Sequence, residues 1–269
     1  MDMTPHFLDK GLVRTLKSGK LSVLVFENRD QLGCAASSAV ADLMRRVIQE
    51  KGRVRMVFAS AMSQTDFLHY LGEEPGIDWS RVYAFHLDDY LDFPSDHEQS
   101  FGKFLIDRLF SRVEGAHFFP INSEAPDPGE ECRRYSSLLK ETPIDIMILG
   151  IGESGHLAFI DPPYCNFNDP EVFRTTEIDD KSRIQMVHDG CFTTMEEVPR
   201  MAYTMTVPAC LLGLSTIIIV PTSLKAKSVR AVVEGPITKD VPASILQKKG
   251  NSWLLIDRDS GNLLGKETP

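Results

Sequence analysis

The stretch DIMILGIGESGHLAFIDPP, residues 145–163, decides most about the fold of this 269-residue chain. Its first part lies in a mostly apolar run over 144–151, interrupted only by Asp145, which is typical of a strand buried on both faces of a sheet. A glycine-rich turn follows at 150–155, and glycines let the backbone turn tightly and approach a ligand closely. His156 comes directly after the turn. The stretch therefore predicts a buried strand that leads into a candidate site.

Similar apolar or β-branched runs occur along the rest of the chain and predict further strands at 21–26, 54–58, 82–87, 216–220 and 252–256. Between them, apolar residues repeat at three- and four-residue spacing and predict helices within 35–48, 63–71, 99–110, 128–140 and 224–234. The alternation predicts an α/β fold with a mostly parallel central sheet and helices on both faces. This is a Rossmann-like three-layer sandwich.

The chain contains no internal repeat or long linker, which predicts a single domain over 21–269 after an N-terminal extension, 1–20. The stretch from 161 to about 199 is rich in Pro, Asp, Asn and Thr and too long for an ordinary connector. We expect this stretch to be a lid-like insertion near the strand ends.

The composition argues against several classes of function. A formal net charge of −9 and a pI near 5.3 argue against partners such as nucleic acid or an anionic membrane surface, but allow small anionic ligands. The five cysteines are scattered, with no Cys-x-x-Cys pair and no histidine close enough in sequence to suggest a zinc site. We therefore expect reduced thiols and no metal site. No apolar run resembles a signal peptide or a membrane span, which predicts a cytoplasmic protein.

Three segments end a predicted strand with polar residues, where parallel sheets bind ligands. The first, FASAMSQ at 58–64, places Ser60, Ser63 and Gln64 before a predicted helix. Backbone N–H groups at a helix start, helped by hydroxyls, suit a phosphate. The alternative is that Ser63 only caps the helix.

The second segment, AFHLDDY at 84–90, runs from a strand into Asp88 and Asp89. Adjacent carboxylates repel each other, which can raise the pKa of one toward that of a proton-transfer group. A solvated turn with a capping aspartate is the alternative.

The third segment is the 145–163 stretch itself. Its His156 has Glu153 and Asp161 within five residues, and a carboxylate beside an imidazole makes a group that accepts and returns a proton near neutral pH. A structural histidine is the alternative. The glycines follow a late strand, and no ribose-binding acid accompanies them, which argues against nicotinamide binding.

Four ordered blocks resemble the glucosamine-6-phosphate deaminase/isomerase family, whose superfamily includes the 6-phosphogluconolactonases. They are FHLDDYLDFPSDHEQSF at 85–101, GIGESGHLAFIDPP at 150–163, VPRMAYTMTVPACLL at 198–212 and VPTSLKAKSVRAVVEGPI at 220–237. The resemblance extends from about residue 21 to 264.

The resemblance implies roles for five positions. Asp88 matches the carboxylate that moves a proton between carbons 1 and 2 of the open-chain sugar, with Asp89 as a supporting neighbour. His156 matches the imidazole that assists ring opening. Asp161 falls where better-known deaminases carry a glutamate paired with this histidine. Lys225 matches the phosphate-binding lysine, and the phosphate loop falls on 60–64.

The chain also departs from the family pattern. Ser154 stands where many deaminases have an aspartate, and the phosphate loop lacks the usual glycines and threonine. The family's lid arginine falls near Gly190, which leaves Arg183 as the substitute. These departures indicate a divergent subgroup whose substrate can differ from glucosamine 6-phosphate.

The sequence thus predicts an enzyme that converts an amino-sugar phosphate, such as glucosamine 6-phosphate, and water to fructose 6-phosphate and ammonia. Proton transfers and water addition suffice, so we expect no cofactor. Two alternatives remain: a 6-phosphogluconolactonase-type hydrolase and a non-catalytic sugar-phosphate-binding protein. The family resemblance also implies a possible homo-oligomer.

Overall fold

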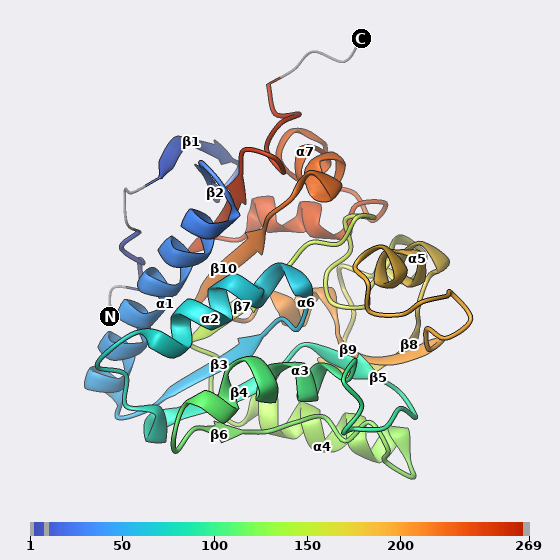
Figure 1. The fold of residues 1–269 in the computed structure, drawn as a ribbon. Helices are drawn as coiled ribbons and strands as arrows, with labels where there is room; N and C mark the ends of the chain where they lie inside the picture. Colours follow the sequence, from blue (N-terminus) through green and yellow to red (C-terminus); the bar gives the residue numbers. More distant parts are fainter. Residues whose placement is uncertain (1–2, 8–10, 266–269) are drawn as a thin grey trace.

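A computed structural model describes residues 3–7 and 11–265. Its main sheet has eight strands in the order β1-β2-β11-β10-β7-β3-β4-β6 (Figure 1). Only the β1–β2 pair among these strands is antiparallel. The strands are β1 (Leu12–Ser18), β2 (Leu21–Phe26), β3 (Val54–Phe58), β4 (Val82–His86), β6 (His117–Phe118), β7 (Ile146–Leu149), β10 (Ser215–Val220) and β11 (Ser252–Asp257).

Helices cover both faces of this sheet, so the predicted three-layer architecture is confirmed (Figure 1). Successive residues of a strand face opposite sides: Met56 of β3 packs with α1, α2 and α3, and Val57 packs on the other face with α4 and α7. The helices are α1 (Arg29–Lys51), α2 (Thr65–Glu73), α3 (Phe101–Arg108), α4 (Pro128–Lys140), α5 (Asp180–His188), α6 (Val207–Cys210) and α7 (Ala226–Glu234).

Most predicted elements are found, with differences at their ends. The strands at 21–26 and 54–58 and the helix at 128–140 have the predicted bounds. The run at 144–151 yields only β7, because the chain leaves the ladder at Gly150 even though Ile151 stays buried. An apolar pattern indicates which residues are buried, and here the buried residues continue beyond the last residue that is paired in the sheet.

The main sheet begins earlier than the sequence predicted. β1 lies within the stretch interpreted as an N-terminal extension and pairs with β2 across the boundary at residue 20. Its central residues are mostly exposed, so the apolar signal is weak there. Residues 1–2 and 8–10 of that stretch, and 266–269 of the predicted domain, lie outside the described ranges.

A second, three-stranded sheet joins β5 (Asp88–Tyr90), β9 (Met201–Met205) and β8 (Phe173–Glu177). The stretch expected as a lid-like insertion contains β8 and α5, and a small core forms between α5 and β5 around Tyr90, Phe159 and Met186. The stretch therefore has regular structure, and its movement as a lid stays a prediction.

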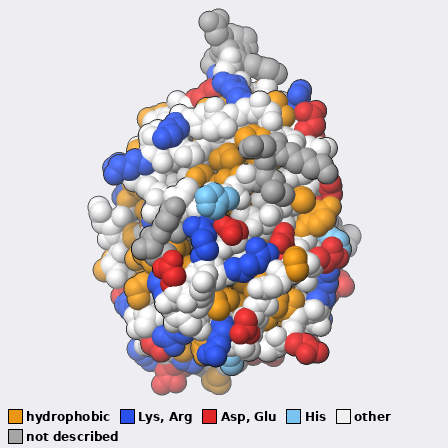
Figure 2. Space-filling model, turned by 90° about the vertical axis from the view of Figure 1, so that its left-hand side faces the viewer, with side chains coloured by type: hydrophobic (Ala, Val, Ile, Leu, Met, Phe, Trp, Pro, Cys, Tyr) orange, Lys and Arg blue, Asp and Glu red, His pale blue; other side chains and the backbone are white. Residues whose placement is uncertain are grey.

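The surface carries charges of both signs. Figure 2 views the side on which Figure 1 places α1, and there basic and acidic side chains are interspersed with hydrophobic ones. In the described part of the chain, no helix combines the length and apolar character needed to cross a membrane. None of the five cysteines, all of which lie in the described part of the chain, is joined in a disulfide.

Candidate active site

A cavity of about 420 Å³ opens at the carboxyl ends of four neighbouring strands, β10, β7, β3 and β4. Parallel strands deliver their following loops to the same edge, so segments far apart in the sequence meet there. The walls come mainly from residues 59–63, 87–88, 150–152 and 221–225, with further side chains from α5. All three segments singled out in the sequence reach this cavity.

The loop after β3 presents Ser60 and Ser63 to the cavity. Gln64 does not line it: its side chain is fully buried, and Nε2 donates to Ser63 Oγ at 3.0 Å and to the Ile219 carbonyl at 3.2 Å. Arg29, which the sequence did not indicate, donates to the Met62 carbonyl at 2.7 Å. Gln64 and Arg29 thus hold this loop in place through hydrogen bonds.

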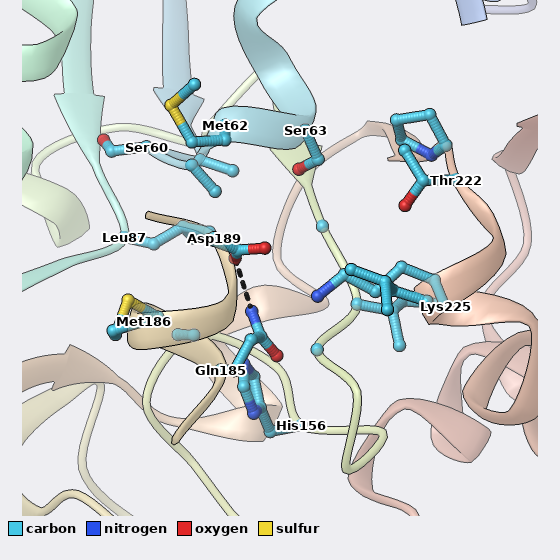
Figure 3. Close-up of a pocket in the computed structure, with 18 of the residues that line it drawn as sticks. Ser60, Met62, Ser63, Leu87, His156, Gln185, Met186, Asp189, Thr222 and Lys225 are labelled. Atoms are coloured by element: carbon cyan, nitrogen blue, oxygen red, sulfur yellow. Dashed lines mark hydrogen bonds between the residues drawn. The ribbon is translucent and has the colours of Figure 1, made fainter. Parts of the chain in front are cut away.

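Lys225 supplies a buried cation. Its side chain points into the cavity below the hydroxyls of Ser63 and Thr222 (Figure 3). Glu153 Oε1 lies 3.9 Å from Nζ, and the described residues offer Nζ no hydrogen-bond acceptor. Burial lowers the pKa of Lys225, opposed by the negative charges of Asp189 and Glu153. A buried ammonium without an acceptor is costly, which makes it a binding point for an anion.

Asp88 lies on the wall at the start of β5, almost fully buried. Burial, and secondly the charge of Asp89, raise the pKa of its carboxyl well above the ordinary value. Such a carboxylate is a stronger base than an exposed one, because proton uptake relieves both penalties.

Asp89 faces away from the cavity. Its carboxylate accepts hydrogen bonds from the backbone N–H groups of Phe101 and Gly102, both at 3.0 Å, and from Ser100 Oγ at 3.2 Å. Burial raises its pKa to about 6, opposed by these hydrogen bonds. Asp89 therefore anchors the first turn of α3, where a carboxylate stabilises the helix start.

His156 stands beside the cavity in a polar cluster. Its Nδ1 lies 3.2 Å from Asp161 Oδ1, 3.0 Å from Ser154 Oγ and 2.8 Å from Ser182 Oγ. A Cβ at Gly152 would stand 2.1 Å from the imidazole carbon Cε1, so only glycine leaves room for the ring. The predicted pairing of the imidazole with Asp161 is present, although the aspartate is one methylene shorter than glutamate.

Asp161 is fully buried behind His156. Burial raises the pKa of this carboxyl, but the positive charge of His156 and hydrogen bonds from His156, Ser182 and Ser154 outweigh burial, and the net pKa is lowered. Asp161 thus stays ionised and faces Nδ1 with a negative charge. Ser154, which stands where many deaminases have an aspartate, contacts both groups through its hydroxyl.

Arg183 is not in the cavity, which corrects its interpretation as a substrate-binding substitute. It is buried on the far side of α5, where it donates to the Val198 carbonyl at 3.2 Å and pairs with Asp180 at 3.1 Å. Other residues of this region, Gln185, Met186 and Asp189, line the cavity instead. Gln185 Nε2 donates to Asp189 Oδ2 at 3.2 Å (Figure 3).

The sequence contained no periodic signal for these α5 residues, because the helix is short and polar. Within residues 3–7 and 11–265, no three His, Cys, Asp or Glu side chains are grouped so as to hold a metal ion.

Known proteins share this sequence pattern and this fold. Residues 27–255 match the model of the glucosamine-6-phosphate isomerases/6-phosphogluconolactonase family. A glucosamine-6-phosphate deaminase of Lactobacillus delbrueckii subsp. bulgaricus is 28% identical over 91% of this chain and 100% of its own. The solved structure of a monomeric glucosamine-6-phosphate deaminase superposes with a TM-score of 0.82 at 26% identity, covering 90% of this chain and 99% of the other.

A 6-phosphogluconolactonase from Trypanosoma brucei shares the fold, with a TM-score of 0.75 at 14% identity over 94% of this chain and 100% of its own. The family match covers most of the sequence, including every block that surrounds the cavity. The chain belongs to the glucosamine-6-phosphate isomerase/6-phosphogluconolactonase family.

Proposed function

We propose that this chain is an amino-sugar phosphate deaminase, which converts glucosamine 6-phosphate or a close relative and water to fructose 6-phosphate and ammonia. The observation that supports it best is the convergence of a buried base, an imidazole–carboxylate pair and a buried cation on one cavity. These are Asp88, His156 with Asp161, and Lys225.

Ring opening is assigned to His156. Asp161 faces Nδ1, so Nε2 is the nitrogen left for the cavity. Nε2 accepts the proton of the anomeric hydroxyl, and the imidazolium that forms returns a proton to the ring oxygen as the ring bond breaks. Asp161 stabilises the imidazolium through its charge.

Isomerisation is assigned to Asp88. Its carboxylate takes the proton from carbon 2 and leaves an enolamine, then returns a proton to carbon 1 to give an imine at carbon 2. Water adds to the imine, and ammonia leaves. The raised pKa of Asp88 suits both halves of the transfer, since the group must take and then release one proton.

Phosphate binding is assigned to Lys225 with the hydroxyls of Ser63 and Thr222. Binding energy from this remote group holds the reacting carbons at Asp88. The cation is nevertheless flanked by Asp189 and Glu153, whose charges oppose the lowering of its pKa by burial. The wall carries the cations Arg29 and Lys225 and also the carboxylates Asp88 and Asp189. A cavity lined by charges of both signs favours a substrate that carries an ammonium group as well as a phosphate.

This charge pattern favours the deaminase over the lactonase, because a phosphogluconolactone has no positive charge for Asp88 and Asp189 to stabilise. The test is a set of parallel assays: ammonia release from amino-sugar 6-phosphates of different configuration, and hydrolysis of 6-phosphogluconolactone. Ammonia release alone supports the proposal. Lactone hydrolysis alone would replace it with the hydrolase, and substrate binding without turnover would indicate a binding protein.

A further inference from the structure

Ser182 connects α5 to the imidazole–carboxylate pair. Its side chain is buried, and Oγ lies 2.8 Å from His156 Nδ1 and 2.8 Å from Asp161 Oδ1. Ser154 makes the same two contacts, at 3.0 and 2.9 Å. Ser154 belongs to the same turn as His156, whereas Ser182 comes from a helix 26 positions further along the chain.

The donors and acceptors in this cluster favour one tautomer of His156. Ionised Asp161 can only accept, and each serine hydroxyl has one proton within reach of Asp161 Oδ1. When both hydroxyls donate to Asp161, their oxygens and Asp161 Oδ1 are left to accept from Nδ1. This arrangement satisfies every group when Nδ1 carries the proton, and Nε2 is then the unprotonated nitrogen that the ring-opening step uses.

The position of Ser182 depends on how α5 is seated. Arg183 ties the far side of the helix to the Val198 carbonyl, and Gln185 Oε1 accepts from the Glu153 N–H at 2.8 Å. The same helix places Gln185, Met186 and Asp189 on the cavity wall. A shift of α5 would therefore change the wall and the hydrogen bonding of His156 together.

We propose that Ser182 is a positioning residue, through which α5 holds His156 in the orientation that ring opening needs. The inference rests on the proposed function for its catalytic consequence. Its structural content, the contribution of Ser182 to holding the Nδ1 side of the ring, can be tested without any activity.

The experiment uses the full chain and three variants. Ser182→Ala removes the hydroxyl, Ser182→Thr keeps one, and Ser37→Ala is the matched control, because Ser37 is an equally buried serine that donates to the Cys34 carbonyl of α1. Nitrogen-15 NMR of the His156 imidazole reports which nitrogen carries the proton. Turnover of the pyranose and solvent-proton exchange at carbon 1 of fructose 6-phosphate separate ring opening from proton shuttling.

We expect Nδ1 to be protonated in all four proteins, because Asp161 and Ser154 still accept from it in Ser182→Ala. The same spectra should show the Nδ1 proton of Ser182→Ala exchanging with solvent faster than in wild type, Ser182→Thr and Ser37→Ala, because one of the three contacts around Nδ1 is lost. Pyranose turnover of Ser182→Ala should fall about tenfold, the effect of one hydrogen bond to a charged group. Solvent-proton exchange at carbon 1 of fructose 6-phosphate does not require the pyranose ring to open, so its rate should change about twofold or less. A twofold change corresponds to about 0.4 kcal/mol, which is within the ordinary effect of a substitution on a step in which the residue takes no part.

The outcomes separate the two proposals. A wild-type protein with Nε2 protonated, or a Ser182→Ala variant whose Nδ1 proton exchanges as slowly as in wild type, would overturn the positioning role; Ser182→Cys, which weakens the hydrogen bonds, replaces Ser182→Ala if that variant does not fold. Equal losses in pyranose turnover and ketose exchange would reduce Ser182 to a packing residue. Absent ammonia release from wild type, together with the expected change in Nδ1 proton exchange, would overturn the deaminase function and leave the positioning role standing.

Discussion

Asp88 and Asp89, adjacent in β5, point to opposite sides of that strand and have different environments. Asp88 faces the cavity, while Asp89 accepts the N–H groups of Phe101 and Gly102 at 3.0 Å. The alternation of a strand separates them. One acid is thereby available for chemistry, and the other holds α3 in place and contributes a negative charge that raises the pKa of Asp88.

Replacing Asp88 with Asn should lower turnover by at least about a hundredfold, because the amide keeps the shape of the side chain but cannot take the proton from carbon 2. The Michaelis constant should change little, since Lys225 still binds the phosphate. Steady-state ammonia release measures both. Turnover near the wild-type value would remove Asp88 from the mechanism.

The same variant should be more stable than wild type near neutral pH. The native pKa of Asp88 is raised above the ordinary value of 3.8, so the native state holds its proton more tightly than the unfolded state does. Stability from this group is therefore lost as pH rises above the unfolded pKa, by about 1.4 kcal/mol for each unit of the shift.

Urea unfolding of wild type and Asp88→Asn at about pH 4 and about pH 7 checks this linkage. The advantage of the variant should be largest at the higher pH and small at the lower one. An advantage that does not change with pH would contradict the raised pKa.

Replacing Asp89 with Asn should destabilise the fold by about 1–3 kcal/mol, because the new amide N–H₂ would face the donors at the start of α3. We expect the urea midpoint to fall, with protection of the α3 amides reduced in hydrogen exchange. Asp107→Asn is a suitable control, since Asp107 is an exposed acid near the other end of the same helix. A variant as stable as this control would show that Asp89 does not anchor α3.

Replacing Lys225 with Ala should raise the Michaelis constant for phosphorylated substrate at least about tenfold and leave the turnover number within about threefold. Inorganic phosphate should raise the melting temperature of wild type but not of this variant. Lys227→Ala provides the matched control, because Lys227 is an exposed lysine in the first turn of α7, two residues after Lys225. Equal phosphate protection in all three proteins would exclude Lys225 from the phosphate site.

Replacing His156 with Gln should impair reaction from the closed pyranose much more than steps that begin from the open-chain ketose. The equilibrium constant ties overall forward and reverse efficiencies together, so the comparison uses solvent-proton exchange at carbon 1 of fructose 6-phosphate, which precedes ring closure. An equal loss in both measurements with a lower melting temperature would indicate a structural histidine. Loss of lactone hydrolysis, with no amino-sugar activity in wild type, would point to the lactonase.

The sequence by itself determined the α/β class, the three layers and most buried strands. Met56 and Val57 contact different apolar layers, and successive apolar residues in a strand indicate burial on both faces. Four ordered blocks also identified the family and the candidate residues Asp88, His156 and Lys225.

Only the tertiary structure decided which of the polar residues share the cavity. Gln64 and Arg183 proved to be buried braces, whereas Gln185 and Asp189 of α5 reached the wall, and Ser182 reached His156 from 26 positions away. Apolar periodicity indicates which face of a helix or strand is buried, whereas these residues make polar contacts between different elements. Gln64 bonds the end of β10, and Ser182 and Gln185 bond the segment after β7. These contacts join segments distant in sequence, and no local pattern records them.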